Sequence, residues 1–296
     1  MCVQVGKQKQ TFGIKKMKRG REHEEWKVTF EQVGQLRSVV EILNNVLTRT
    51  TFKIEDGILH VDNIDAKHVC MVQARLQVVC NHKDPIRFSI TCNTLLNCLR
   101  ACPNHYALEM FKLSDSANVH IKSFELLSNN HQFEADIPTV TDDDDDFTLD
   151  NMEYNHCVEM ELSTLRSTVK TAISLQAQDI RMVVMEPEEQ PEGRKVTAFR
   201  LIGEGGDAKP CFSFISETNE DENIIRTEES MQSASVFESM TEKYEASFSV
   251  TYLNNFLKSM ERQTLMMQLS QGKPLVMNYP LGKENSYVKF VLAARV

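Results

Sequence analysis

Apolar residues recur at helical spacing in four segments of the chain. Within the first, Leu36, Val40 and Leu43 follow one another by four and three residues, and the other segments show the same spacing. This spacing puts the apolar side chains on one face of a helix, so we predict four amphipathic helices, each resting on a neighbouring layer by one face. The four segments are residues 31–47, 90–102, 161–173 and 250–262.

Strand-like alternation fills much of the sequence between these segments. Residues 57–76 predict two short strands around a tight turn at Asp65–His68, and in the second strand Cys70, Val72 and Ala74 point to one face. The opposite face carries Met71, Gln73 and Arg75. Two predicted helices on each side of an acidic segment, among strands, predict an α+β duplication of two similar domains, each with its sheets covered on one side by helices.

Composition sets the predicted domain boundaries. Residues 1–25 are rich in Lys and Gln and poor in apolar side chains, so we predict a flexible basic arm. Residues 135–154 include five consecutive aspartates, which repel one another and disfavour helix and strand, so we predict an acidic linker. The two domains are then residues 26–134 and 155–296.

The charge of the chain is unevenly distributed. The net charge is −9, and the 26 basic and 39 acidic side chains after residue 25 leave −13 for the body. An acidic body repels nucleic acid unless its basic residues gather on one surface. The "KKMKRGR" run at 15–21 would suit a nuclear signal or a nucleic-acid contact, and a solvated arm with neither role explains it equally well.

Basic residues do recur at one angular position of the predicted helices. Each directly follows a residue of the apolar stripe, so the charges lie about 100° around from the buried face. Side by side, such helices would present a shared basic face suited to phosphate contact without base readout, although any one of these residues alone could be an ordinary helix flank. The predicted DNA-binding residues are Arg37, Arg100, Arg166, Lys170 and Lys258, with Arg262 four residues after Lys258.

Motifs for catalysis or cofactor binding are weak in this sequence. The glycine-rich segment 203–209 lacks the spacing of a phosphate-binding loop, and the aspartates at 142–146 lack the alternation of a calcium loop. Cys98 and Cys102 lie on an apolar stripe with His105 nearby, which favours thiol packing over zinc. We therefore predict no metal, no cofactor and no enzyme activity, and reduced cysteines in a nuclear or cytosolic protein.

Residues 57–76, "GILHVDNIDAKHVCMVQARL", carry a family resemblance. They resemble the segment "G-(I/V)-…-M/I-D-(S/A)-x-H-V-x-(L/M)-V-Q-x-x-L" of the proliferating cell nuclear antigen (PCNA) family of DNA sliding clamps. Residues 152–160, 252–258 and 273–296 resemble the end of the family's interdomain linker, its last inner helix and its closing strands. The similarity extends over residues 27–296 and keeps the order of every element.

The resemblance implies a DNA clamp fold, assembled head-to-tail into a homotrimeric ring around duplex DNA with basic helices inside. The implied function is that of a polymerase processivity factor in DNA replication and repair. The implied partners are double-stranded DNA, the clamp loader, DNA polymerase and other proteins with PCNA-interacting peptides, in the nucleus or at a viral replication site. The alternatives are a subunit of a heterotrimeric checkpoint ring and a clamp-derived adaptor that does not encircle DNA.

The resemblance also implies an apolar pocket for partner peptides beneath the linker. Its residues would be Ile64, His68, Val69, Phe147, Leu149, Tyr154, Val291, Leu292, Ala293 and Val296. The acidic linker, Asp150 and Ala294 in place of common prolines, and an acidic insertion at 186–194 depart from the family pattern. These departures indicate a divergent clamp, from a large DNA virus or a distant eukaryote, and bear on peptide specificity more than on the ring.

Overall fold

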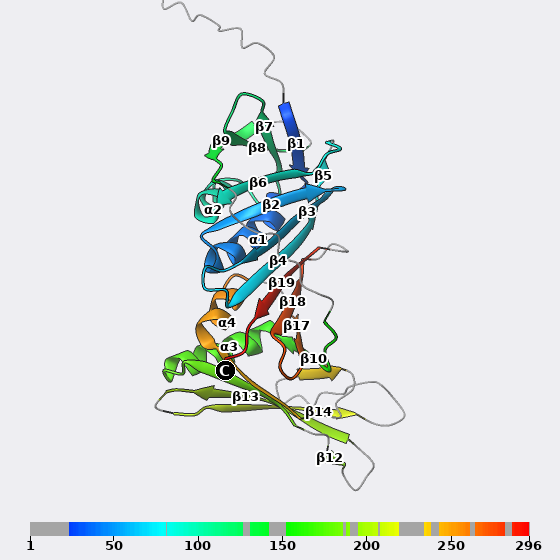
Figure 1. Cartoon of the computed structure of the whole chain (residues 1–296), viewed down its shortest axis with the longest axis vertical. Coiled ribbons are helices and arrows are strands. Elements are labelled where there is room, and N and C mark those ends of the chain that lie inside the picture. The colour runs from blue at the N-terminus through cyan, green and yellow to red at the C-terminus, as the bar shows by residue number, and fades with distance from the viewer. Residues whose placement is uncertain are drawn as a thin grey trace, which may run out of the picture.

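The structure is a computed structural model (Figure 1). It describes residues 24–80, 82–126, 131–141, 152–185, 188–189, 195–206, 208–218, 234–237, 243–260, 264–281 and 286–295. The elements of the first half are β1 (Glu24–Phe30), α1 (Val33–Val46), β2 (Arg49–Glu55), β3 (Ile58–Ile64), β4 (Cys70–Gln77), β5 (Val79–Cys80), β6 (Ile86–Thr91), α2 (Cys92–Arg100), β7 (Ala107–Leu113), β8 (Asn118–Phe124) and β9 (His131–Pro138). Those of the second half are β10 (His156–Glu161), α3 (Leu162–Ser174), β11 (Asp179–Val184), β12 (Glu188–Glu189), β13 (Lys195–Glu204), β14 (Cys211–Thr218), β15 (Ala234–Phe237), β16 (Tyr244–Ser249), α4 (Val250–Leu257), β17 (Thr264–Leu269), β18 (Leu275–Pro280) and β19 (Tyr287–Leu292).

The two halves repeat one topology. In the first, one sheet has the order β5-β1-β7-β8-β9, and the strands β4-β3-β2-β6 form a second set. In the second half, β15-β10-β17-β18-β19 repeats the first order, and β11 lies between β16 and β13, with β14 on the far side of β13. Isolated bridges Ser89↔Val140 and Ser247↔Arg295 are repeated as well, each joining the segment after the last strand to β6 or β16. The predicted α+β duplication is confirmed.

One continuous sheet joins the halves. The last strand, β19, pairs antiparallel with β4, from Tyr287 opposite Arg75 to Leu292 opposite Cys70. This pairing fuses five strands of the second half with four of the first into a nine-stranded sheet. In the described residues, β9 is the last strand of the remaining sheet of the first half, and β14 is the outermost partner of β13 in the second.

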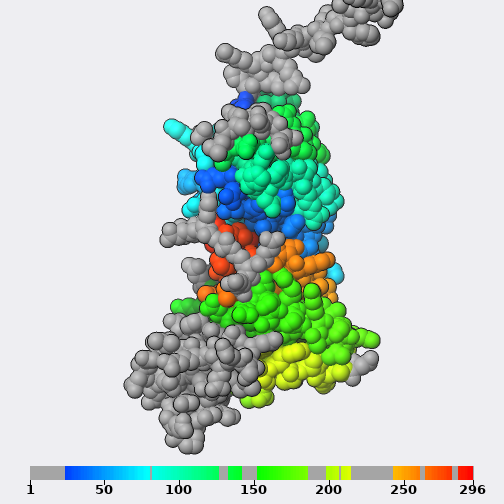
Figure 2. Space-filling model, turned by 180° about the vertical axis from the view of Figure 1, so that it is seen from behind, coloured from blue at the N-terminus to red at the C-terminus, as the bar shows by residue number. Residues whose placement is uncertain are grey.

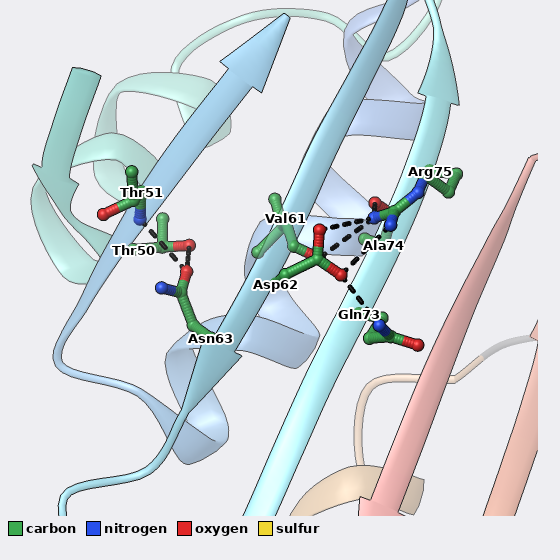
Figure 3. A network of polar contacts seen from close by, with 8 residues as sticks. All are labelled: Thr50, Thr51, Val61, Asp62, Asn63, Gln73, Ala74 and Arg75. Atoms are coloured by element: carbon green, nitrogen blue, oxygen red, sulfur yellow. Dashed lines mark hydrogen bonds and ion pairs between the residues drawn. The ribbon is translucent and has the colours of Figure 1, made fainter. Parts of the chain in front are cut away.

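The predicted alternation in β4 is present, with one face in the main core. Cys70, Val72, Ala74 and Leu76 are buried there, and the opposite face begins with Met71. Polar contacts fix the register of β3 against both neighbouring strands (Figure 3). The Asp62 carboxylate accepts from Gln73 and pairs with Arg75 on β4, whereas Asn63 accepts from Thr50 and Thr51 on β2.

All four predicted helices form, and within the described residues they make one layer (Figure 1). Contacts join α1 to α2, α3 to α4, and α1 to α4, which gives the order α2-α1-α4-α3 along one side of the molecule. From behind, the orange surface of α4 lies between the blue and teal first half and the green of α3 (Figure 2). The buried stripe of α1 contains Leu36, Val40 and Leu43, as predicted, and also Val33. We call α1 to α4 the helix layer.

Aromatic contacts pack the elements of each half together. Trp26 of β1 stacks on Phe88 of β6 at 4.9 Å between ring centroids, which joins the two strand sets of the first half. In the second half, Phe256 of α4 stacks on Phe290 of β19 at 4.2 Å, and both rings are fully buried. Stacked aromatic pairs of this kind add to the free energy gained by burial. The second pair packs α4 of the helix layer directly against β19 of the nine-stranded sheet.

Two predicted boundaries need correction. Strand β9 continues to Pro138 and pairs with β8 through that residue, so residues 135–138 belong to the first domain rather than to the linker. Strand β1 begins at Glu24, inside the predicted arm. The aspartate run at 142–146 lies outside the described residues. In the described part of the chain, no helix is both long and apolar enough to cross a membrane.

Candidate DNA-facing surface and partner pocket

Arg37 and Arg166 occupy matching places in the two halves. The Arg37 guanidinium donates to the carbonyl oxygens of Leu99, at 2.9 Å, and Cys102, at the end of α2. Arg166 donates to the carbonyls of Leu257, at 2.9 and 3.2 Å, and Met260, at the end of α4. Carbonyls at a helix C-terminus lack intrahelical donors and favour a cation, so each arginine caps the partner helix of its own pair.

These contacts change the interpretation of both arginines. We predicted Arg37 and Arg166 as free charges on the DNA-facing surface, but both are half-buried and their guanidinium groups are committed to backbone carbonyls. The predicted angular position of the two arginines was correct. The sequence pattern could not reveal the carbonyl acceptors, because these belong to another helix. We therefore reassign the two residues to helix capping.

The other predicted cations lie on the exposed side of the helix layer. Arg100, Lys170 and Lys258 are all exposed. Arg100 pairs with Glu41 of α1 at 3.5 Å, whereas neither lysine forms an ion pair with another residue that the structure describes. Arg262 lies outside the described residues. The helix layer thus presents exposed cations as predicted, but in two different electrostatic settings.

The turn between β3 and β4 is organised by Asp65. Its carboxylate accepts from the backbone N–H groups of Lys67, Val69 and Cys70 at 3.2, 2.8 and 2.7 Å. His68 adopts a φ of 55°, in the left-handed region that such a tight turn requires. The predicted turn at Asp65–His68 is therefore confirmed, and a side chain holds it as well as the backbone bond from His68 N–H to the Asp65 carbonyl.

Asp65 also connects the turn to the helix layer. The Tyr252 hydroxyl of α4 donates to its second carboxylate oxygen at 2.6 Å. Burial alone would raise the pKa of Asp65, but the hydrogen bonds from Tyr252 and the three backbone N–H groups outweigh it and lower the pKa. Asp65 is therefore a buried carboxylate that links a first-half turn to a second-half helix.

A small apolar cluster lies next to this turn, separate from the main core. Met71, Val276 and Val291 are buried in it, with Ile64 and Tyr154 packed against them. Three of these residues, Ile64, Tyr154 and Val291, were predicted for the peptide pocket. Because the five come from β3, β4, β18, β19 and the segment before β10, they meet only where the two halves join. We call this set the junction cluster.

Several predicted pocket residues lie elsewhere. Leu292 is fully buried in the main core, because it follows Val291 in a strand and must point to the opposite face, so its assignment to the pocket is wrong. Val69 packs partly on the main core, and its carbonyl accepts from the N–H of Ala293 at 2.9 Å. His68 and Ala293 are exposed beside the turn. The remaining predictions, Phe147, Leu149 and Val296, lie outside the described residues.

Three contributors were missed by the sequence interpretation. Met71 lies on the β4 face that we had assigned as the outer one, and Val276 lies on a neighbouring strand of the same sheet, so alternation plus strand pairing would have found both. Lys273 stands 5.6 Å from the ring centroid of Tyr154 and donates to the carbonyl of Glu153. No local pattern marks Lys273, since it acts from the turn between β17 and β18.

Comparison with known proteins agrees with this geometry. No protein-family model matches the chain. Proliferating cell nuclear antigen from Caenorhabditis elegans is 21% identical over 270 residues, which cover 89% of this chain and 94% of that protein. The crystal structure of proliferating cellular nuclear antigen from Entamoeba histolytica matches with a TM-score of 0.74 at 17% identity, over 93% of this chain and 100% of that one. Together with the repeated topology, these comparisons show that the chain has the fold of the DNA sliding clamps and resembles proliferating cell nuclear antigen in sequence over most of its length.

Proposed function

We propose that this protein is a homotrimeric DNA sliding clamp, a processivity factor that encircles duplex DNA and tethers replication and repair proteins in the nucleus without catalysing a reaction. The observation that carries the proposal is that two strand edges pair with each other inside the chain, whereas the two matching edges do not. β19 pairs with β4 within the chain, and their counterparts by topology are β9 and β14. Among the described residues each counterpart is an outermost strand, and each is eight residues long.

A second copy of the chain would supply the missing partner. If β9 of one copy paired with β14 of the next, five strands and four strands would again form one sheet, as they do inside the chain. Such a contact joins two different surfaces, so it propagates from copy to copy and closes into a ring when the rotation allows. The number three follows from the family resemblance. The helix layer would then line the interior of the ring.

Partner peptides would dock beside the junction cluster, beneath the linker. Met71, Val276 and Val291 supply an apolar floor, with Tyr154 at its edge. Buried apolar and aromatic anchors carry most of the energy of such interfaces. We keep Phe147, Leu149 and Val296 as proposed contacts at this site, for DNA polymerase, the clamp loader and other proteins with PCNA-interacting peptides.

The deciding experiment is the solution mass of the purified chain at micromolar concentration, by light scattering or sedimentation. A homotrimer gives three times the 33.9 kDa chain mass. A stable monomer would contradict the homotrimer and favour a subunit of a heterotrimeric ring. Retention on circular duplex DNA, with release when the DNA is cut, then tests encirclement. A trimer that shows no such topological dependence would favour an adaptor that does not encircle DNA.

A further inference from the structure

The capping arginines allow position-by-position comparison of the two helix pairs. Arg166 follows Arg37 by 129 positions, and its acceptor Leu257 follows Leu99 by 158 positions. The second acceptors, Cys102 and Met260, differ by the same 158. Because donor and both acceptors match, α1 corresponds to α3 and α2 to α4 without gaps over these stretches.

This correspondence exposes a difference in charge. Glu41 of α1 matches Lys170 of α3, and Arg100 at the end of α2 matches Lys258 after α4. In the first half the two positions form an ion pair at 3.5 Å, with side-chain exposures of 26% for Glu41 and 56% for Arg100. In the second half both positions are exposed lysines. The capping arginines apart, the helices and these end positions contain no other charged side chain.

The two helix pairs therefore offer different surfaces to a polyanion. An exposed ion pair contributes little to stability, but it cancels the charge that an approaching phosphate meets. Salt screens each exposed charge beyond about 8–10 Å, so the charges nearest a phosphate decide how strongly that phosphate is held. Each pair has one capping arginine; beyond it, the first pair adds no net charge and the second adds two positive charges.

We infer that the DNA backbone is held by the second half of each chain, at Lys170 and Lys258, and that Glu41 prevents α1 and α2 from contributing equally. This inference rests on the proposed function, since it assumes that the helix layer faces DNA. A ring built this way alternates more and less positively charged segments around the duplex. Few phosphates are neutralised per chain, so the affinity falls only gently with salt, which suits a protein that slides.

The test uses two matched double variants of the full chain and a short fluorescent linear duplex of mixed sequence, with anisotropy measured between about 50 and 200 mM salt. Lys170→Gln with Lys258→Gln removes two positive charges. Glu41→Gln with Arg100→Gln removes the ion pair and leaves the net charge unchanged. We expect the lysine variant to bind on the order of tenfold more weakly at the low-salt end with a shallower salt dependence, and the ion-pair variant to bind like the wild type.

A third variant tests the role of Glu41 directly. Glu41→Lys gives the first half the charge of the second, so we expect tighter binding and a steeper salt dependence. Equal losses in the two double variants, or no gain from Glu41→Lys, would overturn the inference while leaving the clamp proposal intact. Failure of the proposed function is a separate result, a wild-type chain that is monomeric or is not retained on circular DNA. Unchanged thermal unfolding midpoints for these surface variants show that folding is intact.

Discussion

The joint between the two halves differs from the outer ends of the molecule in its polar links. At the joint, Tyr252 donates to Asp65, and Asn45 of α1 donates to Ser259 after α4 at 2.6 Å. By the correspondence of the helix pairs, Ala101 stands at the outer end where Ser259 stands at the joint. The two halves share one fold, but side-chain hydrogen bonds connect them at the joint, and the outer end has an alanine where the joint has Ser259.

This difference shows that the pairing of strands and the hydrogen bonds between helices are separate features of the joint. The β19–β4 pairing unites the sheets, and the polar links fix the helix layer above it. The topology of β9 and β14 permits the same strand pairing between two copies. The hydrogen bond between helices is different, because Ser174 and Ala101 stand at the positions of Asn45 and Ser259 and cannot form the amide–hydroxyl bond. In the proposed ring, contacts between copies are then weaker than the joint inside each chain.

The largest expected effect comes from removing an arginine that caps a helix, a feature that both halves share. Arg37→Met or Arg166→Met keeps the apolar part of the side chain and removes the cap, which leaves helix-end carbonyls without their donors. We expect each variant to lower the free energy of unfolding by about 2–4 kcal/mol, by similar amounts. Chemical denaturation measures the loss, and Arg100→Met, at an exposed position, is the matched control. Weakened DNA binding with unchanged stability would return these arginines to the DNA-facing surface.

The next effect concerns the joint alone. Asp65→Asn removes a buried carboxylate that accepts four hydrogen bonds, and we expect a loss of about 1–3 kcal/mol near neutral pH. The folded pKa of Asp65 lies below its unfolded value near 3.9, so its contribution is complete above that value and is lost as pH falls through the folded pKa. Denaturation as a function of pH should therefore show a smaller acid loss in the variant.

Tyr252→Phe is the matched control for this link. It keeps the three backbone bonds to Asp65 and removes only the bond to α4. The loss should be smaller than for Asp65→Asn. An equal loss would mean that the tyrosine hydroxyl, rather than the turn, carries most of the effect. An unchanged acid dependence in Asp65→Asn would contradict the assignment of a depressed pKa to this carboxylate.

The local elements of this fold were predictable because burial is periodic. Each helix carries its apolar stripe, and β4 shows its alternation, so both types could be assigned without knowledge of their neighbours. The duplication followed from the same patterns. The pairing of β19 with β4 joins strands more than two hundred residues apart, and no local pattern in the sequence predicted it.

The site was less predictable because its residues depend on contacts between elements. Arg166 has the sequence pattern of a surface cation. Its capping role depends on the end of α4, which lies beside it only in the folded structure. Met71 could have been found by extending the alternation to the outer face of β4, and the same rule excludes Leu292. Glu41 has no marked pattern in the sequence, and only its contact with Arg100 gives it a role.

A smaller effect tests the unjoined edges. Glu134 and Asp136 are exposed on β9, and Ser213 is exposed on β14, on the face opposite the buried Phe214. In the proposed ring these side chains share one face of the combined sheet. We expect Ser213→Glu to weaken the trimer, and Ser213→Lys to strengthen it, each by about threefold to fivefold in the dissociation constant. Their opposite signs, measured by the concentration dependence of solution mass, are the test, and weakening by both would contradict the proposed pairing.

The smallest effect comes from rebuilding the missing link. Ala101→Ser with Ser174→Asn places at the outer ends the pair that Asn45 and Ser259 form at the joint. If copies meet as the two halves do, the double variant gains one exposed hydrogen bond per contact. We expect about a twofold gain in trimer stability, because net hydrogen-bond energies at exposed sites lie near the low end of 0.5–1.5 kcal/mol.

The single variants are the controls for this reconstruction. Neither Ala101→Ser nor Ser174→Asn alone completes the pair, so a double-mutant cycle on the trimer dissociation constant isolates the link itself. A gain confined to the double variant would place α3 of one copy beside the end of α2 in the next. Additive effects with no coupling would mean that copies of this chain do not meet in the way its halves do, even if they form a trimer.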